Sequence, residues 1–366
     1  MAFINTAPAR SSLSKPLLNL PHPKPPSPRR LTISIIFLGI SAMMLFYLLL
    51  SLAPGLISSR PFHGYTSPWS FDANRSFQPK WMSKLPDTLN ISSLSIPGTH
   101  DTMTYHIDKF SLQCQNWDLM LQMDAGIRYL DIRGRIKDRE LMIYHADQPT
   151  GFSLLDVLGT IDTFLAENPS EFLILRLKEE GKPLGRGRLN AIFEEIFINV
   201  INTKPVTKDR FFFYTDSRVP LPTLGEVRSK IFMFQEFRSR ENQYGLPWNN
   251  TQMILEDKWV IDGVDHLPEK WEAIETALNW ASTMPLDNQH MYVSHVSASV
   301  GLLPVEAAAG PLNRTQVGMN DRTGEWLEKN RYEPNRRVGV LIFDFPGAKL
   351  IENVIKWNRL LWKGPF

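Results

Sequence analysis

Eight short apolar runs, separated by segments of helical periodicity, constrain the fold of this chain more than any other feature of its sequence. Strand-like runs that alternate with helical segments are typical of a parallel sheet with crossover helices. Eight such units predict an α/β protein with a TIM-type (β/α)8 barrel, closed or incompletely closed. The runs span residues 91–100, 126–135, 140–147, 171–180, 229–238, 251–259, 290–298 and 337–347.

The clearest crossover helix follows the third run. Apolar residues recur at intervals of three and four from Leu154 to Leu165, with Ser153 as a potential N-cap and Asn168-Pro169 as a stop signal. The same periodicity predicts further helices at residues 189–196, 271–278 and 350–357.

The N-terminal segment has a different composition. Residues 1–30 are rich in proline and serine, carry five basic residues and no acid, and predict a disordered basic tail. Residues 31–56 contain no charge and are long enough for a transmembrane signal anchor. Because the basic tail precedes the anchor, we expect a cytoplasmic N-terminus and a lumenal or extracellular remainder, which is a single-pass type II topology. Residues 57–84 read as a stalk, and residues 85–366 as the barrel domain.

Composition limits the classes of function that are expected for this protein. The net charge of +2 falls to −3 once the five basic residues of the tail are removed, so a nucleic-acid-binding surface is not expected. Cys114 is the only cysteine, which excludes an internal disulfide and a cysteine-cluster metal site. Four glycosylation sequons follow the anchor, in agreement with the expected topology: Asn74, Asn90, Asn249 and Asn313.

Ionisable residues recur where the runs end. Because the carboxyl ends of parallel strands meet at one rim of a barrel, these side chains are candidates for a shared site. The Pro97-Gly98 pair predicts a turn just before the first of them. The candidates are His100, Asp101, Asp131, Arg133, His145, Lys178, Glu236 or Arg238, Asp257, His295 and Asp344.

Two histidines and an arginine at one rim favour phosphodiester cleavage. One imidazole can act as base and the other as acid, and the guanidinium fork binds a phosphoryl group. A metal mechanism would need clustered carboxylates, and Arg133, two residues after Asp131, would repel a cation. We therefore expect neither a metal nor another cofactor.

Five motifs together resemble a known family: SIPGTHDT (95–102), QMDAGIRYLDIRGR (122–135), LMIYHAD (141–147), NPSEFLILRLKEE (168–180) and VLIFDFP (340–346). From about Leu85 onward, the chain resembles the phosphatidylinositol-specific phospholipase C family of bacterial type, with the X-domain fold. The resemblance implies metal-independent cleavage of an inositol phospholipid through inositol 1,2-cyclic phosphate, with release of diacylglycerol.

The resemblance also implies roles for individual residues. His100 matches the general base that activates the inositol 2-hydroxyl, and Asp344 matches the carboxylate that orients it. His145 matches the general acid, with Asp101 as its partner. Arg133 matches the arginine that stands in place of calcium.

Head-group contacts follow the family less closely. Lys178 and Asp257 match residues that contact inositol hydroxyls, and Trp259 matches an aromatic residue beneath the sugar. The family places an arginine about where Glu236 stands, so either Arg238 substitutes for it or the head-group pocket differs.

Three further positions lack a transferred catalytic role. Asp131 is interpreted as a buried structural carboxylate, and His295 as a rim histidine with satisfied hydrogen bonds. Around His145, Tyr144 and Ala146 replace a histidine and a glycine that are common in the family.

Other functions remain open at this point. Glycosylated inositol lipids present the same phosphodiester. A metal-dependent glycerophosphodiesterase would use a similar barrel, and a barrel could bind inositol lipids without turnover. The sequence does not indicate the oligomeric state or which membrane holds the protein.

Overall fold

The computed structural model describes residues 37–45, 67–186, 192–203, 205–240, 242–330 and 336–361. The chain divides into two units, residues 1–60 and residues 61–366. In the first unit, residues 37–45 are helical. The rest of the predicted anchor and the basic tail lie outside the described residues. No helix within the described ranges is long and apolar enough to cross a membrane.

The second unit is built on one sheet, in which eight strands follow the order β6-β7-β5-β2-β1-β11-β10-β9 and pair in parallel. Among the described residues, no pairing joins β9 to β6, so the barrel is incompletely closed. The predicted fold class is confirmed. The strands are β1 (Ile96–Thr99), β2 (Tyr129–Lys137), β3 (Glu140–His145), β4 (Gln148–Ser153), β5 (Leu173–Glu179), β6 (Phe211–Phe212), β7 (Ile231–Glu236), β8 (Leu246–Pro247), β9 (Met253–Glu256), β10 (Met291–His295) and β11 (Val340–Phe343).

The third apolar run is not a barrel strand, as the sequence had suggested. It forms β3, which pairs antiparallel with the outer half of β2 and with β4. Asp138 and Arg139 link β2 to β3 with φ values of 51° and 68°, and positive φ at both positions is what a type I′ two-residue hairpin turn needs. The missing barrel strand is the two-residue β6, which is too short for its periodicity to be recognised.

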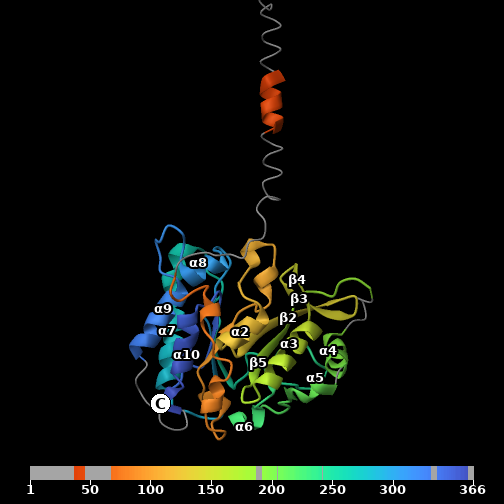
Figure 1. The fold of residues 1–366 in the computed structure, drawn as a ribbon, viewed down its shortest axis with the longest axis vertical. Helices are drawn as coiled ribbons and strands as arrows, with labels where there is room; N and C mark the ends of the chain where they lie inside the picture. The colour runs from red at the N-terminus through yellow and green to blue at the C-terminus, as the bar shows by residue number, and fades with distance from the viewer. Residues whose placement is uncertain are drawn as a thin grey trace, which may run out of the picture. The chain divides into compact units, whose positions relative to one another are not determined.

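Helices cover the outside of the sheet (Figure 1). Helices α7, α9 and α10 pack together on one flank, and α3, α4 and α5 on another. The helices are α2 (Leu119–Ala125), α3 (Leu154–Glu167), α4 (Phe193–Asn202), α5 (Pro205–Asp209), α6 (Leu224–Val227), α7 (Leu267–Thr283), α8 (Pro304–Ala309), α9 (Met319–Asn330) and α10 (Ala348–Lys356).

The helix after the third run confirms its sequence signals. Ser153 caps α3, and its side chain and that of Asp156 form a reciprocal capping box. The helices predicted at residues 271–278 and 350–357 correspond to α7 and α10. Helix α4 begins at Phe193, and Leu189 lies outside the described residues.

Part of the segment interpreted as a stalk belongs to the packed unit. From residue 67 onward it contributes buried side chains, among them Trp69, Trp81 and Met82. The indole nitrogen of Trp81 donates to the Gly126 carbonyl oxygen at 3.0 Å. Residues 67–84 therefore pack against the barrel.

The Pro97-Gly98 pair lies inside β1 and does not form the predicted turn. A Cβ atom on Gly98 would lie 2.8 Å from the Cβ of Tyr129, so only glycine allows β2 to approach this closely. Buried on both faces, β1 brings the residue that follows Thr99 to the carboxyl-terminal rim.

Candidate active site

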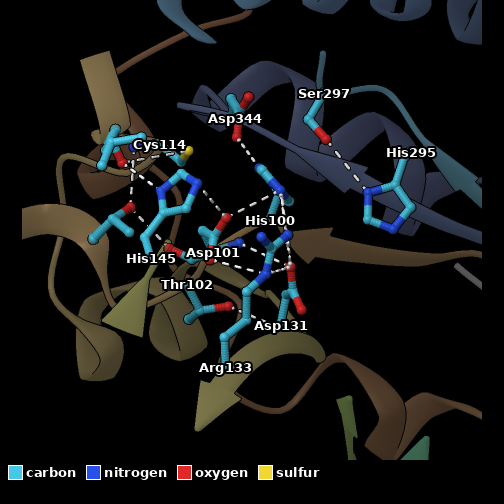
Figure 2. Close-up of polar contacts among 12 residues, drawn as sticks. His100, Asp101, Thr102, Cys114, Asp131, Arg133, His145, His295, Ser297 and Asp344 are labelled. Atoms are coloured by element: carbon cyan, nitrogen blue, oxygen red, sulfur yellow. Dashed lines mark hydrogen bonds and ion pairs between the residues drawn. The ribbon is translucent and has the colours of Figure 1, made fainter. Parts of the chain in front are cut away.

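The residues at the centre of the site lie on, or just after, three neighbouring strands. In the sheet, Thr99 of β1 pairs with Phe343 of β11 and with Leu130 of β2. The residues just beyond these pairs, His100 and Asp344, therefore emerge side by side. Arg133 extends from β2 at the same edge (Figure 2).

Hydrogen bonds fix the tautomer of His100. Its Nδ1 lies 2.9 Å from Asp344 Oδ1, and its Nε2 lies 2.6 Å from Arg133 Nη2. A guanidinium can only donate, so Nε2 accepts and the ring proton is on Nδ1. Burial, with Arg133 beside it, holds the pKa of His100 well below its usual range. The imidazole is therefore neutral, with its basic lone pair on Nε2.

His145 faces the same centre from the hairpin. Its Nδ1 lies 2.8 Å from the backbone oxygen of Leu112, which only accepts, so this nitrogen carries a proton. Its Nε2 lies 3.3 Å from Asp101 Oδ2. The rings of His145 and His100 are 6.2 Å apart. A proton on His145 Nε2 would thus be stabilised by a carboxylate and directed at the space between the two rings.

Asp101 links both histidines and the arginine. Its Oδ2 lies 3.1 Å from His100 Nε2, and its Oδ1 lies 3.0 Å from Arg133 Nε. Burial raises the pKa of Asp101. Its backbone has a φ of 41°, a left-handed conformation that is uncommon for a residue other than glycine. A hydrogen bond of 3.2 Å from its N–H to Asp131 Oδ2 helps to hold this conformation.

Asp131 connects two arginines. Its Oδ2 accepts from Arg133 Nη2 at 3.0 Å, and its Oδ1 lies 3.4 Å from Arg176 Nη1. Burial alone would raise the pKa of Asp131, but the two guanidinium groups outweigh it and hold the pKa well below its usual range. The buried structural carboxylate expected from the sequence is thus a permanent counter-ion that positions Arg133.

Arg176 is a site residue that the sequence interpretation missed. It lies in β5, donates from Nε to Glu236 Oε2 at 2.7 Å, and stacks 3.8 Å from the ring centroid of Trp248. Alternation along the strand could have identified it, because Arg176 and Lys178 are two residues apart and share a face. Trp248 gives no such signal because it lies in a loop.

This contact distinguishes Glu236 from Arg238. Glu236 pairs with Arg176 from the neighbouring strand, whereas Arg238 lies beyond the end of β7 with an exposed side chain. Arg176, and not Arg238, therefore brings a second guanidinium to the site.

The other residues expected to contact the head group are Lys178, Asp257 and Trp259, and they differ in burial and in their contacts. Lys178 is opposite Arg133 in the pairing of β5 with β2, and its Nζ lies 3.6 Å from Glu180 Oε2. Asp257 follows β9, and burial raises its pKa to about 6. Trp259 is 47% exposed, and within the described part of the chain no hydrogen bond or ring contact joins it to His100 or His145.

One potential metal-ligand group occurs among the described residues: His100, Asp101 and Cys114. The charges there do not fit a cation, because Arg133 already bonds to both His100 and Asp101. Burial also raises the pKa of the Cys114 thiol well above its usual range, which disfavours the thiolate that binds metals. Arg133 supplies the positive charge of this site.

His295 differs from the satisfied rim histidine that the sequence suggested. It is 2% exposed, and its ring lies 5.8 Å from that of His100. Its Nδ1 lies 3.4 Å from Ser297 Oγ, but its buried Nε2 has no hydrogen-bond partner. The sequence did not reveal this burial, because it does not show that Trp248 packs against the His295 ring, with 5.9 Å between the ring centroids.

Comparison with known proteins agrees with this geometry. The family model for the phosphatidylinositol-specific phospholipase C X domain matches residues 91–237. A 1-phosphatidylinositol phosphodiesterase of Listeria monocytogenes is 35% identical over 295 residues, which cover 76% of this chain and 85% of the relative. The human PI-PLC X domain-containing protein 1 is 32% identical over 330 residues, covering 79% and 95% of the two chains.

A solved structure extends the likeness to three dimensions. The phosphatidylinositol-specific phospholipase C from Listeria monocytogenes matches with a TM-score of 0.62 and 33% identity, over 77% of this chain and 99% of the solved chain. Both the shared barrel and the sequence identity therefore support one assignment. The chain belongs to the phosphatidylinositol-specific phospholipase C X-domain family.

Proposed function

We propose that this protein cleaves the phosphodiester bond of an inositol phospholipid without a metal ion and releases diacylglycerol. The observation that carries the proposal is the pair of histidines in complementary surroundings. His100 Nε2 is a neutral acceptor, oriented by Asp344, and His145 presents Nε2 toward Asp101 from across the site. The Listeria relative, whose name gives phosphatidylinositol as its substrate, supports the choice of substrate.

The reaction uses a hydroxyl of the substrate as its nucleophile. His100 Nε2 takes the proton from the inositol 2-hydroxyl, whose oxygen attacks phosphorus. The bond from phosphorus to the diacylglycerol oxygen then breaks, and His145 Nε2 gives its proton to that oxygen. The products are inositol 1,2-cyclic phosphate and diacylglycerol, and the two histidines have exchanged protonation states.

Arg133 stabilises the charge that develops on phosphorus. Its guanidinium is held on one side by Asp101 and on the other by Asp131, at 3.0 Å each. Burial alone would lower the pKa of Arg133, but these two carboxylates raise it well above its usual range, so the charge is permanent. A fixed cation needs no reorganisation as the phosphorane forms.

The activity is tested on residues 61–366 with phosphatidylinositol vesicles in excess EDTA, followed by ³¹P NMR. We expect the resonance of inositol 1,2-cyclic phosphate to appear and to be absent with His100→Ala. Turnover that is lost in EDTA and restored by calcium would contradict the metal-free mechanism. Binding of the vesicles without turnover would instead favour a non-catalytic lipid-binding barrel.

We also propose the type II topology, with the barrel on the lumenal or extracellular side. The support is the uncharged segment 31–56 behind a basic tail, together with the conformation of one sequon. Asn313 is exposed, and its Oδ1 accepts a 2.9 Å hydrogen bond from the Thr315 hydroxyl. A mobility shift of the expressed full chain after glycosidase treatment is expected, and it should be smaller in Asn313→Gln because one of the four sequons is lost. Cleavage of the barrel by protease added to the cytosolic side would contradict the topology.

A further inference from the structure

The two histidines define the direction in which a substrate lies. In an in-line displacement, the attacking and leaving oxygens are on opposite sides of phosphorus. The base contacts the attacking oxygen, which belongs to the inositol ring, and the acid contacts the oxygen of diacylglycerol. The inositol ring must therefore extend from His100 away from His145.

His295 lies in that direction. Figure 2 shows His145 on one side of His100 and His295 on the other. The rings of His100 and His295 are 5.8 Å apart and nearly perpendicular, at 82°. Trp248 contacts the His295 ring edge to face at 5.9 Å and also stacks on Arg176. The side of the site that would receive the sugar thus has an aromatic wall with one histidine in it.

The position of His295 is fixed at the end of β10. Its backbone oxygen accepts a 2.6 Å hydrogen bond from Lys270 Nζ, and that buried ammonium also pairs with Glu256 at 2.9 Å. Ser297 contacts its Nδ1. A residue anchored at its backbone and on one ring nitrogen cannot easily turn its other nitrogen elsewhere.

The unpaired Nε2 of His295 requires an explanation. Buried polar atoms in folded proteins almost always have a partner, and leaving one without a partner destabilises the fold. This atom is buried and has no partner among the described residues. The His295 ring lies 5.8 Å from that of the base, on the side where the mechanism places a ring that carries several hydroxyls.

We propose that His295 Nε2 binds a hydroxyl group of the inositol ring and so positions the ring against His100. This inference rests on the proposed phosphodiesterase function and extends it to a polyol-specific contact. The imidazole acts as a neutral group, because burial and the nearby Arg176 hold its pKa well below the usual range. His295 is a substrate-binding residue and takes no part in proton transfer.

The test compares two substitutions of His295 that differ in polarity. His295→Phe keeps the ring shape and loses the nitrogen, and His295→Gln keeps a polar atom near the same place. We expect kcat/KM on phosphatidylinositol to fall about fivefold to tenfold in His295→Phe and less in His295→Gln, as for the loss of one hydrogen bond. The inhibition constant of myo-inositol should rise by the same factor. The exposed His266→Phe serves as the matched control and should change neither value.

A binding measurement separates this inference from the proposed function. NMR titration of the wild-type protein with myo-inositol should shift the His295 ring resonances, and His295→Phe should bind more weakly, whether or not the protein turns over lipid. If the protein cleaves phosphatidylinositol but His295→Phe retains full kcat/KM and the wild-type myo-inositol affinity, the inference is wrong. If no lipid is cleaved, the proposed function is wrong, and the titration with myo-inositol alone shows whether His295 binds the inositol ring. Equal melting temperatures confirm that the variants are folded.

Discussion

His100 and Asp344 are 244 residues apart in the sequence, yet the imidazole Nδ1 and the carboxylate Oδ1 meet at 2.9 Å. The contact exists because β1 and β11 are adjacent parallel strands that end level with each other. Together with the hydrogen bond that Arg133 donates to Nε2, it determines which ring nitrogen carries the proton, and therefore which nitrogen can act as a base. Asp344 is buried and His100 is half-buried at the rim, so water competes little for the hydrogen bond.

Asp344→Asn tests whether this hydrogen bond sets the tautomer. The amide of asparagine can donate to Nδ1, which would place the ring proton on Nε2 and remove the base. We expect kcat to fall by roughly 10²–10⁴-fold, the range typical of losing general base catalysis, with little change in KM. Steady-state kinetics with phosphatidylinositol measure this, and a loss of less than threefold would show that the tautomer does not depend on Asp344.

The acid role of His145 predicts a dependence on the leaving group. His145→Ala should reduce cleavage of phosphatidylinositol by roughly 10²–10⁴-fold, because an alkoxide is a poor leaving group without a proton. With a nitrophenyl ester of inositol phosphate, the leaving group needs no proton, and the loss should be far smaller. His100→Ala is the matched control, because the base is needed for both substrates. Equal losses of His145→Ala on the two substrates would refute the assignment.

Arg176 and Arg238 provide a matched pair of variants for the head-group side. Arg176→Lys keeps a positive charge but cannot bind Asp131 and Glu236 together while stacking on Trp248, so kcat/KM should fall about tenfold or more. Arg238 is exposed, and Arg238→Lys should stay within about twofold of the wild type. The reverse order of effects would restore Arg238 as the functional arginine.

Asp257 predicts a pH dependence of stability. Burial raises its pKa from 3.8 to about 6, so the folded protein binds this proton more tightly than the unfolded chain does. The favourable contribution is therefore complete below about pH 4 and is lost as the pH rises through about 6. Asp257→Asn removes the charge, and partial exposure limits the effect to about 1–2 kcal/mol. We expect the free energy of unfolding of Asp257→Asn to exceed that of the wild type at pH 7 and to match it at pH 4.

The free energy of unfolding is measured by urea denaturation of residues 61–366 at the two pH values. Activity is recorded in parallel, because Asp257 is also a candidate contact to inositol hydroxyls. A stability difference that is the same at pH 4 and pH 7 would mean that Asp257 does not titrate in this range.

The local pattern of the sequence was sufficient for much of the fold. The apolar runs, the Ser153 cap and the period of α3 are properties of neighbouring residues, and they predicted a (β/α)8 barrel, closed or incompletely closed, with a reactive rim. The hairpin of β2 and β3 was missed because an apolar run does not show whether its strand is parallel or antiparallel to its neighbour. Only pairing with β2 shows that β3 is antiparallel.

For the site, the sequence by itself determined which residue types stand at the strand ends, including His100, His145 and Arg133. Tertiary structure alone decided what those residues contact. The tautomer of His100, the joining of two arginines through Asp131, and the unpaired nitrogen of His295 all depend on groups from distant strands. Hydrogen-bond direction and burial depend on which residues are neighbours in three dimensions, and the order of residues along the chain does not show this.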